Sequence, residues 1–339
     1  MDITTLQELP PWEWPEEAAE HLLSTLRNAG EEESRRCLAA ELAGEVSVIN
    51  DELAEALLAV GQDPKAPEAL RLEALHSLGP GLECADIEGF DDPEEMVIAE
   101  KTFLRVLQGL RNLYEDSKLP DSLRQTALEA SVHAPQEWHP EAIHKAFSNK
   151  DERWKLTAVF CMGFLPGFQK EILEALKSRN EDIHHEAIIA AGNWEVEEAW
   201  PHIAGLVTSK GTDKYLLMAA IEAAAAIRPQ ESLEILAPHL LSDDEDIVDM
   251  THEAMAMAQG QLEGEDDDEE DEETRLRRDD ASPAERKKHC SGTSARDWPR
   301  NGSLDKTPRR QPQFGSITKA CAPRRDSPSP CHAGPASRR

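Results

Sequence analysis

Residues 67–79 read PEALRLEALHSLG, and this stretch decides the fold. A large residue, Leu70, is followed by small residues at four and seven positions further on, Ala74 and Ser77, and by Gly79 at nine. Steps of four and seven fall on one face of an α-helix, and small side chains there let a neighbouring helix approach closely. The stretch therefore predicts a helix whose small-residue face is interior.

The same skeleton occurs in seven stretches whose first positions are 35, 53, 31, 29, 32 and 32 residues apart. They read Arg35/Ala39/Leu42/Gly44, Leu70/Ala74/Ser77/Gly79, Leu123/Ala127/Ala130/Val132, Trp154/Ala158/Cys161/Gly163, Ile183/Ala187/Ala190/Gly192, Tyr215/Ala219/Glu222/Ala224 and Ile247/Thr251/Ala254/Ala256. A fixed period of this length is typical of a helical solenoid, in which neighbouring units bury one another's apolar faces.

Each unit is predicted to be a helical hairpin. A helix-start residue stands three positions before six of the seven motifs: Pro67, Pro120, Asp151, Asn180, Thr212 and Asp244. Such residues satisfy or remove the free N–H groups of a first helical turn. A shorter apolar pattern precedes each motif and predicts the partner helix. With aromatic residues at only 5%, we expect an all-α chain of about seven hairpins without strands.

The motif resembles the HEAT-repeat superfamily, in particular the short-unit type of phycobilisome-lyase-like proteins. Leu70-Arg71 with Ala74, Leu78 and Gly79 carries the resemblance best, followed by Leu123-Arg124. Later units have other residues where the family places Arg: Lys155, His184, Leu216 and Val248. The resemblance covers residues 15–260 and implies an α-α superhelix, a HEAT-like solenoid whose second helices line a concave side.

On that geometry, we expect a broad, shallow surface that binds another protein or peptide. The residues expected to contact the partner are Arg71, Arg124, Lys155, His184, His185, Lys214 and Met250. Long-range attraction by an acidic surface would favour a basic partner. We therefore expect a non-catalytic scaffold without a cofactor, and a HEAT-type enzyme, lyase-like or metal-dependent, is the competing class.

Deoxyhypusine hydroxylases resemble this chain in fold and use recurring His-Glu pairs as iron ligands. His185-Glu186 stands at the matching place, whereas His252-Glu253 is shifted along its helix. One matching pair does not build a two-iron site, so we expect no metal. Motifs for phosphate binding, hydrolase triads and zincins do not occur in the sequence. A bilin lyase is the enzyme alternative, and only the repeat itself supports it.

An insertion interrupts the array of repeats. Between the second and third motifs, about 22 extra residues hold Pro80, Gly81, Gly89 and several acids, which predict a loop over 80–92 before a long helix from about Pro93 to Tyr114. This loop is either a site of contact with a partner or a surface insertion without a binding role.

Near the N-terminus, Trp12 and Trp14 either close the exposed end of the first unit or bind a partner.

Charge divides the chain. Residues 275–339 hold 16 Lys/Arg against 6 Asp/Glu, and the rest holds 20 against 61. We expect a solenoid over 1–262, an acidic linker over 263–274 and a disordered basic tail over 275–339. We consider three accounts of the tail. It has no specific role, it binds the acidic solenoid or an anionic partner, or it is a segment translated in another reading frame. An acidic array disfavours nucleic acid, and the sequence shows no membrane span or leader, so we expect a cytoplasmic protein.

Overall fold

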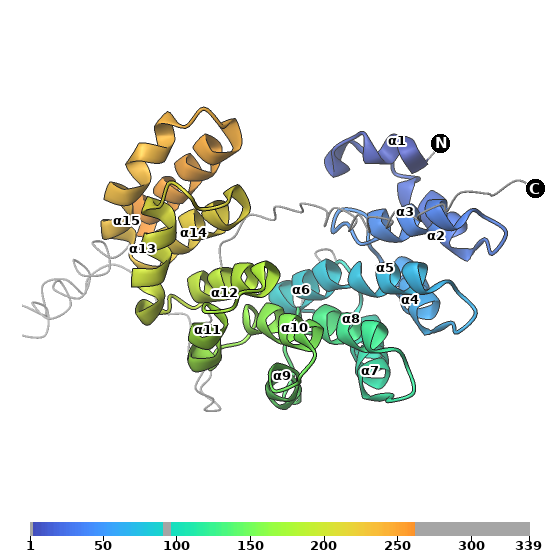
Figure 1. Ribbon diagram of the computed structural model, residues 1–339. Helices are drawn as coiled ribbons and strands as arrows, with labels where there is room; N and C mark the ends of the chain where they lie inside the picture. The colour runs from blue at the N-terminus through green and yellow to red at the C-terminus, as the bar shows by residue number, and fades with distance from the viewer. Residues whose placement is uncertain (1–2, 91–95, 262–339) are drawn as a thin grey trace, which may run out of the picture. The chain divides into compact units, whose positions relative to one another are not determined.

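The computed structural model describes residues 3–90 and 96–261. The chain divides into two units, Met1–Arg286 and Lys287–Arg339, and every described residue belongs to the first. The described residues form helices joined by turns, and none of them forms a strand, as the sequence predicts (Figure 1). The predicted linker at 263–274 and tail at 275–339 lie outside the described residues.

Seven pairs of helices follow one another along the chain. The first helices of the pairs are α2 (Ala18–Arg27), α4 (Asp51–Gln62), α7 (Glu100–Glu115), α9 (His139–Phe147), α11 (Gln169–Ala175), α13 (Trp200–Thr208) and α15 (Pro229–Leu236). The second helices carry the repeated motif, and we call them the motif helices: α3 (Glu33–Ala43), α5 (Glu68–His76), α8 (Asp121–Ser131), α10 (Glu152–Met162), α12 (Glu181–Asn193), α14 (Lys214–Ile227) and residues 245–261.

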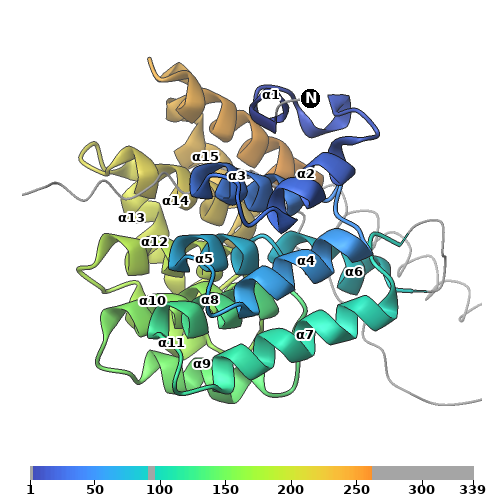
Figure 2. The same cartoon turned by 90° about the vertical axis from the view of Figure 1, so that its right-hand side faces the viewer.

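Each of the first six motif helices packs against the first helix of its own pair, and consecutive motif helices pack on one another from α3 and α5 through to α12 and α14. Among the first helices, α2 packs on α4 and α4 on α7, and Figure 2 shows α4 and α7 side by side. This repeated packing is the predicted solenoid of hairpins. The remaining short elements are α1 (Ile3–Gln7), η1 (Pro11–Glu13), α6 (Gly79–Glu88), η2 (Glu197–Ala199) and η3 (Ala237–Leu241).

The core forms where the motif predicts it. The residues at four and seven positions after the first, such as Ala74, Ala127 and Ala190, are fully or almost fully buried. Close packing depends on the glycine at nine: a Cβ on Gly192 would lie 2.9 Å from Cα of Ala223 in the next unit. The small-residue pattern therefore exists because adjacent motif helices touch backbone to backbone.

Polar caps start several motif helices as predicted. Asn180 Oδ1 accepts hydrogen bonds from the backbone N–H groups of Asp182 and Ile183, and Asp151 Oδ1 accepts one from Arg153. In the sixth unit, however, the capping residue is Asp213 and not Thr212. These caps satisfy N–H groups that the helix itself leaves unpaired.

The register of the sixth unit differs from the predicted one. Tyr215, predicted as its first core position, is 52% exposed, whereas Ala220, Ala223 and Ala225 are buried. The first position is therefore Leu216, one residue later, in agreement with the cap at Asp213. The shift moves Glu222 out of the small-residue position and onto the side of the helix.

The insertion after the second motif is partly helical, so the predicted loop is wrong for residues 80–88. Residues 79–88 form α6, which packs on α8, and α7 begins only at Glu100, not near Pro93. Glycine here serves close packing: a Cβ on Gly79 would lie 2.7 Å from His133 Cδ2, and one on Gly81 would lie 2.7 Å from Ile49 Cδ1. Glu83 Oε2 lies 2.8 Å from His133 Nδ1 and ties α6 to the residues after α8.

The N-terminal end is closed by α1, whose Ile3 and Leu6 are buried and which packs on α2 and α3. The Trp14 indole N–H donates to the carbonyl oxygens of Leu6 (2.9 Å) and Leu9 (3.0 Å). Trp12 is 82% exposed, so of the two alternatives given for the tryptophans, closure of this end is wrong for Trp12. None of the described helices combines the length and the apolar character that crossing a membrane would require.

Candidate binding surface

The arginine that follows the first motif position has a structural role. Arg36, Arg71 and Arg124 each donate a hydrogen bond to a backbone carbonyl ten residues earlier, on Leu26, Gly61 and Tyr114. These carbonyls lie near the ends of α2, α4 and α7, where a helix leaves its last C=O groups unpaired. In these three units, the side chain at this position, which we call +1, therefore points towards the first helix of its own hairpin.

This geometry corrects two predicted partner contacts. Arg71 is only 7% exposed, with its Nε 2.9 Å from the Gly61 carbonyl oxygen, so it is not a surface contact. Met250 is also only 7% exposed and belongs to the core of the last unit. The prediction of partner contacts is thus wrong for these two residues, because both were chosen from an assumed concave face.

Arg124 is engaged on several sides. Its Nε donates to the Tyr114 carbonyl oxygen (3.0 Å), and its Nη1 lies 3.0 Å from Asp121 Oδ1. The guanidinium lies over the rings of Tyr114 and Trp154, at 5.9 and 5.3 Å from their centroids. These contacts join the third unit to the fourth, and a partner would meet little of this side chain.

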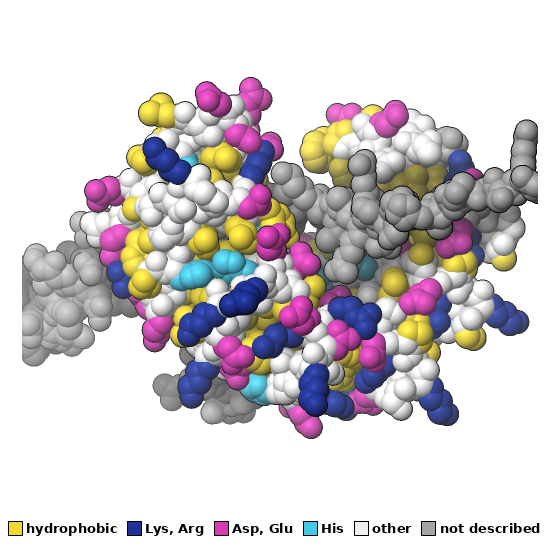
Figure 3. Space-filling view, viewed as in Figure 1, with side chains coloured by type: hydrophobic (Ala, Val, Ile, Leu, Met, Phe, Trp, Pro, Cys, Tyr) yellow, Lys and Arg dark blue, Asp and Glu magenta, His cyan; other side chains and the backbone are white. Residues whose placement is uncertain are grey.

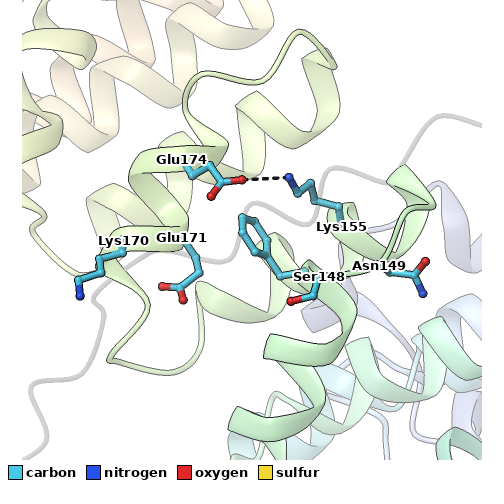
Figure 4. A pocket seen from close by; sticks show the side chains of 7 residues that line it. Ser148, Asn149, Lys155, Lys170, Glu171 and Glu174 are labelled. Carbon is cyan, nitrogen blue, oxygen red and sulfur yellow. Dashed lines mark hydrogen bonds and ion pairs between the residues drawn. The ribbon is translucent and has the colours of Figure 1, made fainter.

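The side chain of Lys155 points towards the following unit. Its Nζ lies 3.3 Å from Glu174 Oε1 of α11 and 4.5 Å from the centre of the Phe147 ring. These residues line a pocket of about 460 Å³ between α9, α10 and α11 (Figure 4). Its other lining side chains are Ser148, Asn149, Lys170 and Glu171. Positively and negatively charged side chains both line the pocket, so its charge favours neither a cationic nor an anionic ligand.

Lys214 pairs with two acids at the start of the last motif helix. Its Nζ lies 2.7 Å from Asp244 and 2.7 Å from Asp246. These hydrogen bonds lower the pKa of Asp244 and raise that of Lys214. Lys214 therefore links the sixth unit to the seventh at an exposed site.

The side of the motif helices that faces away from the first helices carries acids. At 100° per residue, positions +3 and +6 lie about 200° and about 140° round the helix from +1. Glutamate occupies one of these positions in six of the seven motif helices, and we call the set the acidic row: Glu41, Glu73, Glu129, Glu186, Glu222 and Glu253. Figure 3 shows acidic side chains spread over several helices on one face, with Lys and Arg among them.

Neighbouring members of the acidic row influence one another. Burial, followed by the charge of Glu41, raises the pKa of Glu73 above its ordinary value. Burial and the charge of Glu253 raise the pKa of Glu222, and His185 acts in the opposite direction. In both cases burial and the neighbouring charge disfavour the ionised carboxylate, and a cation nearby would offset this effect.

The middle of the acidic row lies around α10. Thr157 Oγ1 donates to Glu129 Oε1 at 2.5 Å, which joins α10 to α8. Burial raises the pKa of the Cys161 thiol well above its ordinary value, and the charges of Glu129 and Glu186 add to this effect. Cys161 therefore stays a protonated core residue between two acids of the row.

An aromatic platform lies beside the acidic row. The His185 ring stacks on Tyr215 of α14, with centroids 3.6 Å apart and an angle of 10° between planes. His185 Nδ1 lies 3.4 Å from Glu186 Oε1. His185 is thus the one predicted contact residue that the structure brings together with acids of the row, and Tyr215 is a surface residue that the sequence analysis placed in the core.

His184 makes a separate contact. Its Nε2 lies 2.7 Å from Nε2 of His202 on α13. The sequence analysis named His184 as a contact but did not connect it to His202. In the described ranges, 3–90 and 96–261, no three His, Cys, Asp or Glu side chains come together as a group that would hold a metal ion.

Comparisons with known proteins agree with the repeat. Residues 170–256 match the model of a family described as HEAT repeats, and this range runs from α11 into the last motif helix. The match supports the HEAT-repeat superfamily for this part of the chain, while the phycobilisome-lyase-like subtype stays a prediction. No curated protein sequence matches the chain.

Two solved structures are similar in outline. Human deoxyhypusine hydroxylase in complex with glycerol is 16% identical, with a TM-score of 0.35, and the match covers 76% of this chain and 88% of that one. The Escherichia coli protein YibA is 14% identical, with a TM-score of 0.34, and the match covers 72% and 98%. At these TM-scores neither likeness carries an argument about this chain.

Proposed function

We propose that the protein is a non-catalytic scaffold that binds a basic protein segment along the acidic row. The row supplies one carboxylate from each of six motif helices. An extended chain with several Lys or Arg residues meets these acceptors in turn. The proposal includes a cytoplasmic location, and it keeps the phycobilisome-lyase-like subtype that Leu70 and Arg71 suggest.

The observation that carries the proposal is the crowding of like charges at the two ends of the row. Glu41 raises the pKa of Glu73, and Glu253 raises that of Glu222, each in addition to partial burial. Such an arrangement costs stability in the free protein. A bound ammonium or guanidinium group would offset this cost, which favours a cationic ligand over a neutral or acidic one.

The stacked pair of His185 and Tyr215 supplies a second element of recognition. Tyr215 is 52% exposed and its ring is held flat against His185. A fixed aromatic face loses little conformational entropy when a partner binds, and it attracts cations as well as apolar groups. We place the strongest single contact of the partner at this platform, between Glu186 and Glu222.

A titration tests the proposal. The full chain is titrated with a fluorescent peptide of alternating lysine and alanine, and fluorescence anisotropy gives the dissociation constant. The triple variant Glu73→Gln, Glu186→Gln, Glu222→Gln removes three charges from the row. We expect its affinity to fall on the order of tenfold, which corresponds to about 1.4 kcal/mol.

The matched control removes three exposed charges elsewhere: Glu137→Gln, Glu198→Gln, Glu234→Gln. Because the two variants have the same net charge, a general electrostatic attraction would weaken binding equally in both. Equal losses, or no loss in the row variant, would mean that the peptide binds another acidic part of the chain, such as Glu265–Glu273.

A further inference from the structure

Two histidines from neighbouring units contact each other through their Nε2 atoms. Nε2 of His184, at position +1 of α12, lies 2.7 Å from Nε2 of His202 in the first turn of α13. Their ring centroids are 4.9 Å apart, and the rings meet edge to face at 62°. The contact joins the fifth unit to the sixth.

His184 departs from what its repeat position does earlier in the chain. In the first three units, the +1 arginine turns back to a carbonyl of its own hairpin. His184 instead points forward to the first helix of the next hairpin. His202 meets it from Trp200-Pro201-His202, where a proline in the first turn fixes the start of α13.

We propose that His184 and His202 form a site for a divalent late transition-metal ion, Ni²⁺ or Cu²⁺ in preference to Zn²⁺, which links the fifth and sixth units. Imidazole nitrogen is a ligand that these ions bind well. The site has two ligands from the protein, and water or a group from a bound partner occupies the other positions. It differs from the His185-Glu186 pair, which stacks on Tyr215.

The distance between the nitrogens favours these ions. A metal–nitrogen bond is about 2.0–2.1 Å. Two ligands at right angles, as in square-planar or octahedral coordination, then have nitrogens about 2.9 Å apart, and two tetrahedral ligands about 3.3 Å apart. The observed 2.7 Å lies closer to the right-angle geometry. Binding Ni²⁺ or Cu²⁺ replaces this hydrogen bond, so both rings turn until their Nε2 lone pairs point at the ion while the two nitrogens stay close together.

The protonation state is also suitable. Burial lowers the pKa of both imidazoles, and the neighbouring His202 and His185 lower that of His184 further. The lowered pKa values favour the neutral ring, and the neutral ring is the form that binds metals. In the free protein one Nε2–H donates to the other Nε2. When the metal binds both Nε2 atoms, the donor ring exchanges its Nε2 proton with solvent for one on Nδ1, so that each neutral ring is then protonated at Nδ1.

The site is open on one side. Both imidazoles are partly exposed, and histidine side chains reach the surface on the face shown in Figure 3. A metal ion would therefore reach the pair from solvent. Because only two imidazoles replace water on the ion, we expect weak binding, with a Kd roughly in the micromolar range.

The test is thermal unfolding of the full chain with NiCl₂. At a Ni²⁺ concentration about 100 times Kd, we expect Tm to rise by about 5 °C or more. In the variants His184→Gln and His202→Gln this rise disappears. Glutamine can still hydrogen-bond to the remaining histidine, so either variant is expected to keep the fold. The metal-free Tm of each variant checks this.

A second measurement distinguishes this site from other side chains that can bind a metal ion, which include His289, Cys290 and Cys321. Bound to Cu²⁺, the wild type should give an electron paramagnetic resonance spectrum with splitting from two nitrogens, and His202→Gln should lose it. His252→Gln, an exposed histidine on the last helix, is the control and should behave as wild type. An equal Ni²⁺ response in wild type and in His202→Gln, or no response in either, would overturn the proposal.

Discussion

Glu222 of α14 and Glu253 of the next motif helix lie near enough for the charge of Glu253 to act on Glu222, where the sixth and seventh units join. The pKa of Glu222 is raised by burial and by the charge of Glu253. A neutral residue at position 222 would make the folded protein more stable than the ionised glutamate does. We interpret this difference as a stability cost that the binding surface requires.

Replacing Glu222 by Gln should therefore stabilise the protein at neutral pH. A group whose pKa is raised on folding contributes stability below its unfolded pKa and loses it as pH rises through the folded pKa. At pH 7 the ionised Glu222 is destabilising, and at pH 3.5 it is protonated. Urea unfolding should show a gain at pH 7 and little change at pH 3.5. The exposed control Glu198→Gln should show no such gain.

A buried histidine predicts loss of stability in mild acid. His139 Nδ1 accepts the backbone N–H of Gln136 (2.8 Å), and its Nε2 lies 2.9 Å from Ser131 Oγ. Burial, with a smaller effect of Arg111, lowers the pKa of His139 to about 4. Because the folded pKa lies below the unfolded value, the stability is fully present above about pH 6.5 and is lost as pH falls towards 4. The full loss from this group is about 3 kcal/mol.

The variant His139→Asn keeps an acceptor for the Gln136 N–H but does not titrate. Its unfolding free energy should be lower than wild type at pH 8 and should fall less between pH 8 and pH 5. Parallel pH profiles for the two proteins would show that His139 is not the group responsible.

Gly192 should not tolerate a side chain. An added Cβ would lie 2.9 Å from Cα and 3.0 Å from Cβ of Ala223, where two motif helices touch. We expect Gly192→Ala to lower the unfolding free energy by about 1–3 kcal/mol. Gly205, inside α13, has open space around it, so Gly205→Ala should be neutral or gain about 0.5–1 kcal/mol. Chemical denaturation of both variants measures the contrast.

The two N-terminal tryptophans should behave differently. Trp14→Phe loses two hydrogen bonds to carbonyls of the α1 region, and we expect it to cost about 1–2 kcal/mol locally. Hydrogen exchange of residues 3–9 should become faster, because Trp14 holds them in place. Trp12→Phe should leave exchange unchanged, since Trp12 is exposed. Equal exchange in both variants would contradict this account of the N-terminal end.

The solenoid was predictable because its signal is repeated. Small residues at four and seven positions, with caps such as Asn180, predict both helices and their buried faces. The sixth unit was placed one residue out of register because residues 219–226 are nearly all alanine. In such a run, several registers put small side chains on the same face.

The candidate surface was harder to predict. A charged residue at +1 has the composition of a surface residue, and only the folded hairpin brings Arg71 to the Gly61 carbonyl. The acids at +3 and +6 were visible in the sequence. Their alignment required the direction of +1, which depends on how a motif helix packs on its own first helix. The meeting of His184 with His202 likewise depends on the packing of α12 against the next hairpin.

The most direct test of the central claim is zero-length cross-linking of the full chain to the lysine peptide with a carbodiimide, which joins amines to carboxylates in contact. Mass spectrometry then identifies the linked residues. The acidic row as binding surface predicts links at Glu73, Glu186 and Glu222, and high salt should suppress them. Links confined to Glu265–Glu273, or spread equally over Glu137, Glu198 and Glu234, would contradict the claim.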